Sequence, residues 1–97
     1  MKIARKKPHE PWEIIDIENT LEALQHEVGG YIETFTITTD CCLVMNEEGA
    51  IRNLPYNLRF LGLQLFGTVL AVGVKGDEFC DLPLSGMRLF SREAVLT

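Results

Sequence analysis

The chain is 97 residues long, so it can form one domain with one modest core, and we expect that domain to span residues 1–97. A hydrophobic fraction of 46% with 24% charged residues is typical of a globular protein and argues against disorder. Four of the nine Lys and Arg residues lie in the first seven positions, so residues 8–97 carry five basic and fourteen acidic side chains, a net charge of −9. Such an acidic body disfavours direct binding of nucleic acid.

The basic first segment is expected to be solvated, and the alternative is an arm that contacts nucleic acid. Pro8–Pro11 follows it, where a secretion signal would have a run of apolar residues. The most apolar stretch, Leu61–Val74, is too short and too rich in glycine for a membrane helix. Three cysteines are an odd number, which favours free thiols over a disulfide framework. We therefore expect a cytoplasmic protein that does not enter a membrane.

The first predicted elements are a hairpin and a helix. Trp12–Ile17 is rich in β-forming residues and is predicted to be a strand, with Lys2–Lys6 as its hairpin partner. Asn19 and Glu22 fit a capping box, in which the asparagine begins the helix and the glutamate reaches back to it. The pair Gly29–Gly30 supplies the left-handed residue with which many helices end.

The later elements complete the predicted fold. Leu21, Leu24 and Val28 recur at helical spacing, so we expect this face of the helix to pack on a sheet. Leu54–Leu61 is ambiguous and compatible with a short helix, and a last short helix is predicted within Ser85–Val95. The remaining strands are predicted at Tyr31–Thr38, Cys41–Met45, Phe66–Val74 and Glu78–Leu82. This order predicts an α+β fold: a small antiparallel or mixed β-sheet with one main amphipathic helix and one or two short helices.

No motif in the sequence indicates catalysis or a bound cofactor. Cys41 and Cys42 are adjacent in a predicted strand, so their side chains point to opposite faces and do not suit one metal ion. His9 lies in a proline-flanked loop and His26 on the polar side of the helix, without a nucleophile motif nearby. We therefore expect no catalytic residue, no cofactor and no metal site.

Polar and charged side chains cluster between the second cysteine and the central apolar strand. The possible binding surface consists of Asn46, Glu47, Glu48, Arg52, Asn53, Asn57 and Arg59. The two glutamates fall in a predicted turn and would add to an acidic, protein-binding surface. The asparagines and arginines would instead suit a cleft for a small ligand, and the sequence leaves both alternatives open.

Self-association is a further expectation. Phe66–Val74 is strongly apolar, and a chain with few helices can leave one sheet face or one edge strand uncovered, so we expect a dimer. In the alternative, Leu58–Leu65 and Met87–Leu96 fold over that face and the protein is a monomer.

Several segments together carry a family resemblance. The chain resembles the bacterial and phage family called domain of unknown function 3846 from Ile17 to about Leu82. The segments that carry the likeness are Leu21–Gln25, Val28–Glu33, Leu43–Gly49, Leu54–Pro55 with Asn57, and Gly67–Gly73.

The resemblance implies an accessory protein of a phage, plasmid or conjugative element, and it carries no catalytic residues to this chain. Small acidic accessory proteins commonly bind a host protein, in some cases by imitating the charge of DNA, so we expect a host protein as the partner and no enzymatic activity. The alternative is an oligomer that sequesters a nucleotide signal. An enzyme and a structural component of a phage remain open as well.

Overall fold

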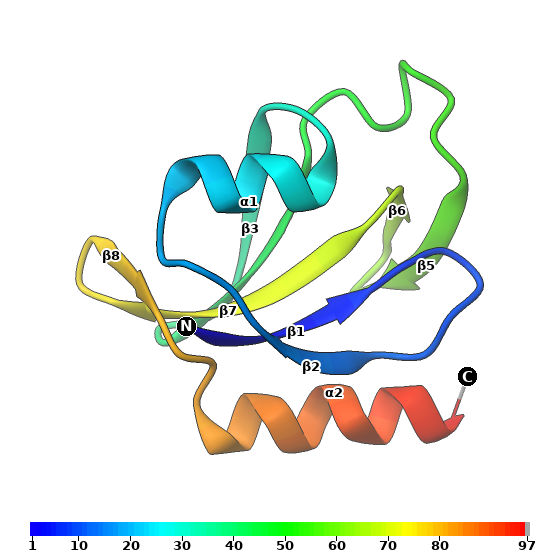
Figure 1. Ribbon diagram of the computed structural model, residues 1–97. Helices are drawn as coiled ribbons and strands as arrows, with labels where there is room; N and C mark the ends of the chain where they lie inside the picture. Colours follow the sequence, from blue (N-terminus) through cyan, green and yellow to red (C-terminus); the bar gives the residue numbers. More distant parts are fainter. Residues whose placement is uncertain (97) are drawn as a thin grey trace.

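A computed structural model describes the backbone of residues 1–96 and the side chains of residues 1–90 (Figure 1). The described chain forms an α+β fold that is mostly β-sheet. Its elements in order are β1 Lys2–Lys6, β2 Glu13–Asp16, α1 Leu21–Val28, β3 Ile32–Thr38, β4 Cys41–Asn46, β5 Tyr56–Phe60, β6 Leu63–Phe66, β7 Val69–Lys75, β8 Glu78–Cys80 and α2 Leu84–Leu96.

The main sheet is antiparallel and is organised around β7. Its strands follow the order β2-β1-β7-β4-β3, and β8 pairs with the end of β7. On one side of β7, Ala71 pairs with Ala4 of β1, and on the other side it pairs with Leu43 of β4. The pair Gly73 and Cys80 then continues the sheet into β8. The antiparallel form of the expected sheet is therefore the one observed.

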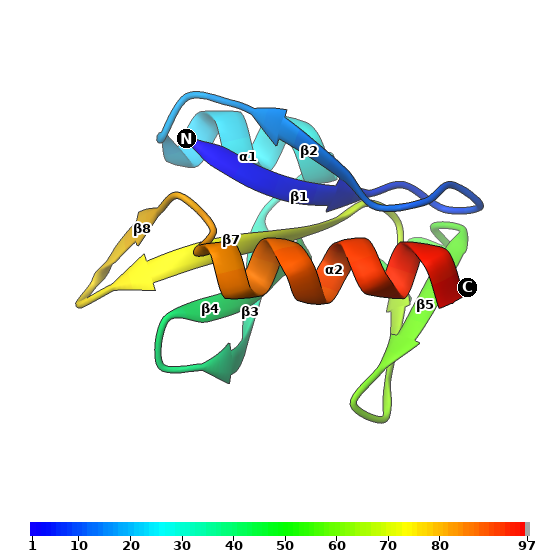
Figure 2. The same cartoon turned by 90° about the horizontal axis from the view of Figure 1, so that it is seen from below.

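Both faces of the sheet are covered, because alternate residues of its central strands point to two separate cores. In β4, Cys41 and Leu43 belong to one core, whereas Cys42 and Val44 belong to the other. α1 lies over the second core (Figure 1). α2 crosses the opposite face, and the hairpin β5–β6, a separate two-stranded sheet, lies beside it (Figure 2).

The first core is covered by the two segments that were expected to fold over the sheet in a monomer. Leu58, Phe60 and Leu65 of the hairpin are buried in this core. Phe90 of α2 is fully buried there, with its ring centroid 4.6 Å from that of Trp12 and 5.8 Å from that of Phe60. An uncovered sheet face therefore gives no reason for self-association.

α1 begins one residue later than the capping box predicted. Thr20 is the N-cap, since its Oγ1 accepts a hydrogen bond from the N–H of Ala23 (3.1 Å). Asn19 instead donates from Nδ2 to the carbonyl of Phe79 (2.9 Å), which fastens the start of the helix to β8. The predicted stop is confirmed, because Gly29 has φ of 78° and closes the helix on Gln25.

Three further predictions about the elements need correction. Leu21 does not share the buried face of α1: it is 52% exposed, whereas Leu24 and Val28 are buried. The ambiguous segment is the strand β5 rather than a helix. α2, predicted as short, spans 13 residues against 8 for α1, so α1 is not the one main helix.

Candidate functional site

The loop between β4 and β5, residues 47–55, is anchored by Asn46. Its buried side chain donates from Nδ2 to the carbonyl of Val28 at the end of α1 (3.1 Å). Its Oδ1 accepts from the backbone N–H of Glu48 (2.8 Å), which turns the chain into the loop. Residue 30 must be small beside this anchor, because a Cβ on Gly30 would lie 2.8 Å from Nδ2 of Asn46. α1 and the loop are therefore fixed to each other.

Hydrogen bonds continue through the loop and restrict its shape. The backbone N–H of Arg52 donates to the carbonyl of Glu48 (2.8 Å), and that of Leu54 donates to the carbonyl of Gly49 (3.0 Å). The Arg52 side chain also donates from Nη1 to the carbonyl of Gly29, at the longer distance of 3.4 Å. The loop is thus ordered by its own bonds and by a second link to the end of α1.

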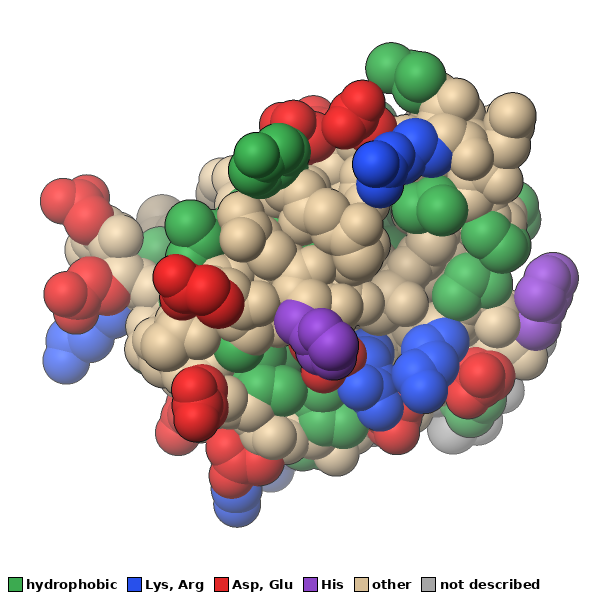
Figure 3. Space-filling model, turned by 45° about the horizontal axis from the view of Figure 1, so that its top comes forward, with side chains coloured by type: hydrophobic (Ala, Val, Ile, Leu, Met, Phe, Trp, Pro, Cys, Tyr) green, Lys and Arg blue, Asp and Glu red, His purple; other side chains and the backbone are tan. Residues whose placement is uncertain are grey.

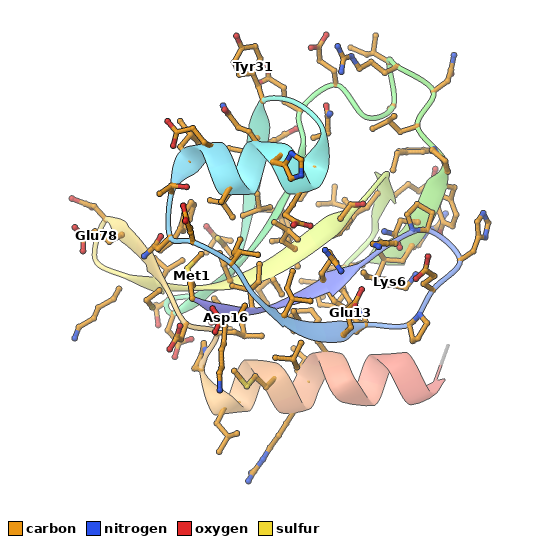
Figure 4. All side chains as sticks on the ribbon, viewed as in Figure 1. Met1, Lys6, Glu13, Asp16, Tyr31 and Glu78 are labelled. Carbon is orange, nitrogen blue, oxygen red and sulfur yellow. The ribbon has the colours of Figure 1, made fainter. Side chains whose placement is uncertain are left out.

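We call the exposed side chains around this loop the loop-end surface; they are Tyr31, Glu47, Glu48, Ile51 and Arg52. Ile51 is 80% exposed and Tyr31 is 68% exposed. Tyr31 projects away from the sheet above α1 (Figure 4). Acidic, basic and apolar side chains lie close together along the upper edge of Figure 3. Among the described side chains, neither glutamate forms an ion pair.

A shallow cleft of about 220 Å³ opens within this surface. It is lined by Gln25, Gly29, Gly30, Tyr31, Glu48 and Arg52. The lining combines an aromatic ring, a carboxylate, a guanidinium group and the carboxyl end of α1. Such a lining suits a polar or charged side chain of another molecule.

The structure brings some of the predicted surface residues together and separates others. Glu47, Glu48, Arg52 and Asn53 are all exposed on the loop. Arg59 is exposed too, but it lies in β5, where it pairs with Gln64 of β6. The expectation of an exposed binding residue is wrong for Asn46 and Asn57. They are 5% and 8% exposed, and their polar groups form hydrogen bonds within the chain.

Asn57 forms the second buried polar anchor, together with Lys6. Nζ of Lys6, which is only 6% exposed, donates to Oδ1 of Asn57 (2.7 Å). Nδ2 of Asn57 donates to the carbonyls of Lys6 (2.8 Å) and Gly67 (2.7 Å). Burial lowers the pKa of the Lys6 ammonium, and the labelled side chain lies against β5 in Figure 4. These bonds join β1, β5 and the connection into β7.

The three cysteines are free thiols, and the environments of two of them are clearly defined. Cys41 and Cys42 are buried in different cores, and desolvation raises the pKa of each thiol to about 11. His9 and His26 are exposed. In the described residues, no three His, Cys, Asp or Glu side chains converge as metal ligands do.

The raised thiol pKa values predict a loss of stability at alkaline pH. In the folded chain Cys41 and Cys42 stay protonated up to a pKa of about 11, whereas their ordinary value is 9.0. The contribution of these thiols to the free energy of unfolding is fully present below pH 9. It is lost as the pH rises from 9 through about 11, because the unfolded chain releases these protons first. Urea denaturation at several pH values in this window measures the effect.

The control for this prediction is the double variant Cys41→Ala/Cys42→Ala. Its free energy of unfolding should fall less steeply between pH 9 and pH 11 than that of the wild type. Comparing the two slopes cancels the contributions of the other titrating groups. One of them is Lys6, whose lowered pKa makes stability rise with pH instead of fall. Equal slopes in the two proteins would show the thiols to be as accessible as in the unfolded chain.

Sequence reasoning missed the two apolar members of the loop-end surface. Ile51 has Gly49 and Asn53 two positions away on either side, so it lacks the alternation of a half-buried strand, and this could have marked it as exposed. Tyr31 is the first residue of the predicted strand Tyr31–Thr38, but β3 begins at Ile32, so the tyrosine precedes the strand. The side chain of Tyr31 is free to point outward because the left-handed end of α1 turns the chain immediately before it.

Comparisons with known proteins place the chain in a family. No described helix is long and apolar enough to cross a membrane. No curated protein and no solved structure matches the chain. The model of one family, Domain of unknown function (DUF3846), matches residues 1–94, a wider range than the segment in which the resemblance was expected. The chain therefore belongs to the DUF3846 family.

Proposed function

We propose that this protein acts without enzymatic activity, by binding another protein through its loop-end surface. The observation that carries the proposal is the exposure of Ile51 and Tyr31 beside Glu47, Glu48 and Arg52 on an ordered loop. In the setting that the family resemblance implies, the protein belongs to a mobile genetic element. Its partner is then a protein of the bacterial host, met in the cytoplasm.

The composition of this surface supports binding of a protein. Tyrosine and arginine are enriched among the residues that dominate protein–protein binding energy. Burying the side chain of Ile51 would contribute about 1.5–3 kcal/mol to the interaction. Because the loop is already ordered by Asn46 and by its own backbone bonds, little conformational entropy is lost when the partner binds.

At the loop-end surface, the size of the cleft favours a side chain of a protein partner over a small ligand. Pockets for small molecules have volumes of about 300–1,000 Å³, and the cleft beside Tyr31 holds about 220 Å³ and is open to solvent. A single side chain of a partner fits this space. Glu48 and Arg52 give the lining charges of both signs, so a polar or charged side chain of the partner suits it.

Replacing Ile51 with aspartate should abolish capture of the partner. The wild-type protein and the variant are used as baits in a lysate of bacterial host cells, and bound proteins are quantified by mass spectrometry. The matched control is Leu84→Asp, since Leu84 is also an exposed leucine-sized side chain (64%) but lies at the start of α2, across the sheet. We expect one protein to be captured by the wild type and by the control, and to be lost with Ile51→Asp.

Reversing the two acidic charges tests the polar part of the same surface. With the captured protein purified, Glu47→Lys/Glu48→Lys should weaken its binding and reduce the salt dependence of the affinity. The melting temperature should change little, because both side chains are exposed. If a captured protein binds all these variants equally well, the loop-end surface is not the interface.

A further inference from the structure

In the part of the chain that the structure describes, β3 is an edge strand: it covers Ile32–Thr38 and pairs with β4 and with no other strand. With seven residues it is as long as the central strand β7. An edge of this length offers a row of free N–H and C=O groups, to which another strand can bind.

The alternation of an antiparallel ladder identifies which backbone groups are free. The N–H of Glu47 donates to the carbonyl of Tyr31 (3.0 Å), so Tyr31 is a hydrogen-bonded position opposite β4. Because hydrogen-bonded positions alternate along the strand, Ile32, Thr34 and Thr36 direct their N–H and C=O groups outward. A register shift between Thr36 and Thr38 ends this regular pattern. The regular outer edge is thus residues 32–36, with Thr34 at its centre.

The side chains of this edge do not protect it, in contrast to the opposite edge of the sheet. Residues 32–36 contain no proline and no lysine, and both threonines are exposed. β2, the edge strand at the other end of the strand order, has only four residues, Glu13–Asp16, and follows Pro11. Both its ends are acidic. Proline, lysine and shortness are usual devices that prevent pairing of edges, and residues 32–36 have none of them; their one charged residue is Glu33.

We propose that two copies of this chain associate through β3, antiparallel, about a two-fold axis at Thr34. Thr34 of one copy then forms a hydrogen-bonded pair with Thr34 of the second copy, and Ile32 does so with Thr36. The two sheets join into one. The edge binds a second copy because residues 32–36 are complementary to themselves. Glu33 and Phe35, which lie between these pairs, show this complementarity.

The register at Thr34 places no like charges together. Glu33, which carries the charge of this edge, lies opposite Phe35 of the second copy, in a non-hydrogen-bonded pair where the side chains approach most closely. Phe35 is only partly buried in its own chain, so its ring has surface left to contact the neighbour. A register centred on Glu33 would instead place two carboxylates opposite each other. A register centred on Thr34 pairs every outward-facing residue of the regular edge with a residue of the second copy.

The first test is the mass of the wild-type protein in solution. Light scattering at 100 µM should give about twice the 10.9 kDa of one chain. Because the association is proposed independently of the loop-end surface, Ile51→Asp should give the same mass as the wild type. A wild-type mass of one chain at this concentration would overturn the proposal and leave the edge free for a strand of another protein.

The second test fixes the axis by charge. Thr34→Lys and Thr34→Glu each place two like charges opposite each other, so each variant alone should dissociate at least tenfold more readily than the wild type. An equimolar mixture places a lysine opposite a glutamate, and a dimer containing one copy of each should form again. This recovery also shows that both variants are folded. Thr39→Lys, the same change at an exposed position beyond the strand, is the control and should remain dimeric.

The outcomes of the second test are decisive in both directions. Dissociation of the separate variants with recovery in the mixture establishes an axis at Thr34. The axis at Thr34 is overturned if Thr34→Lys remains as dimeric as the wild type, or if the mixture stays monomeric.

Discussion

Replacing Asn57 with alanine is expected to lower the free energy of unfolding by about 3–5 kcal/mol. The side chain of Asn57 makes three buried hydrogen bonds, one with Nζ of Lys6 and two with the carbonyls of Lys6 and Gly67. Without it, a buried ammonium group and two carbonyls lose their partner, and the cost of a buried charge left alone exceeds that of a neutral group. Urea denaturation monitored through Trp12 measures the loss.

Two further variants make this prediction specific. Arg59→Ala alters an exposed side chain two positions further along the same strand and should change stability by no more than about 0.5 kcal/mol. Lys6→Met/Asn57→Ala removes the buried charge together with its partner, so it should be more stable than Asn57→Ala alone. An Asn57→Ala protein as stable as the Arg59→Ala protein would contradict the role assigned to this anchor.

Replacing Leu24 with alanine is expected to cost about 2–5 kcal/mol of stability. Leu24 is 1% exposed and packs with residues such as Val44 and Leu70 in the core beneath α1. Truncating it leaves a cavity that a short helix pinned at both ends cannot close easily. The denaturation midpoint in urea, at an unchanged slope, reports the loss.

Leu21 is the matched control for Leu24, because it is the same residue type in the same helix and is 52% exposed. Leu21→Ala should change stability by no more than about 0.5 kcal/mol. Similar losses in the two variants would mean that α1 is rotated about its axis relative to the structure described above.

β3 and β4 were predictable because they are rich in hydrophobic and β-branched residues, and β1 was predictable as the hairpin partner of the strand that follows Pro11. β1 has the predicted bounds, and β3 and β4 each differ from them by one residue. The hairpin β5–β6 was missed because its turn contains Leu61 at φ of 49° before Gly62 at φ of 83°. Leucine rarely adopts a positive φ, so nothing in the sequence marks this turn as the usual asparagine–glycine or glycine pair would.

The candidate site was harder to predict, because one residue type serves opposite purposes in it. Asparagine on the surface and asparagine that satisfies buried backbone groups have the same appearance in a sequence. Asn53 is exposed, whereas Asn46 and Asn57 are buried because tertiary contacts bring Val28, Lys6 and Gly67 to them. Segments distant in sequence supply those partners, so no local pattern reveals them.

The central position of β7 has a consequence for how the protein folds during synthesis. β1–β2 and β3–β4 can each form early as local hairpins, but in the sheet β7 lies between β1 and β4. No sheet spanning both hairpins can therefore form until residues 69–75 have left the ribosome. Until then the apolar faces of both hairpins are exposed in the nascent chain, which is the interval in which this chain is most open to chaperones and to misassociation.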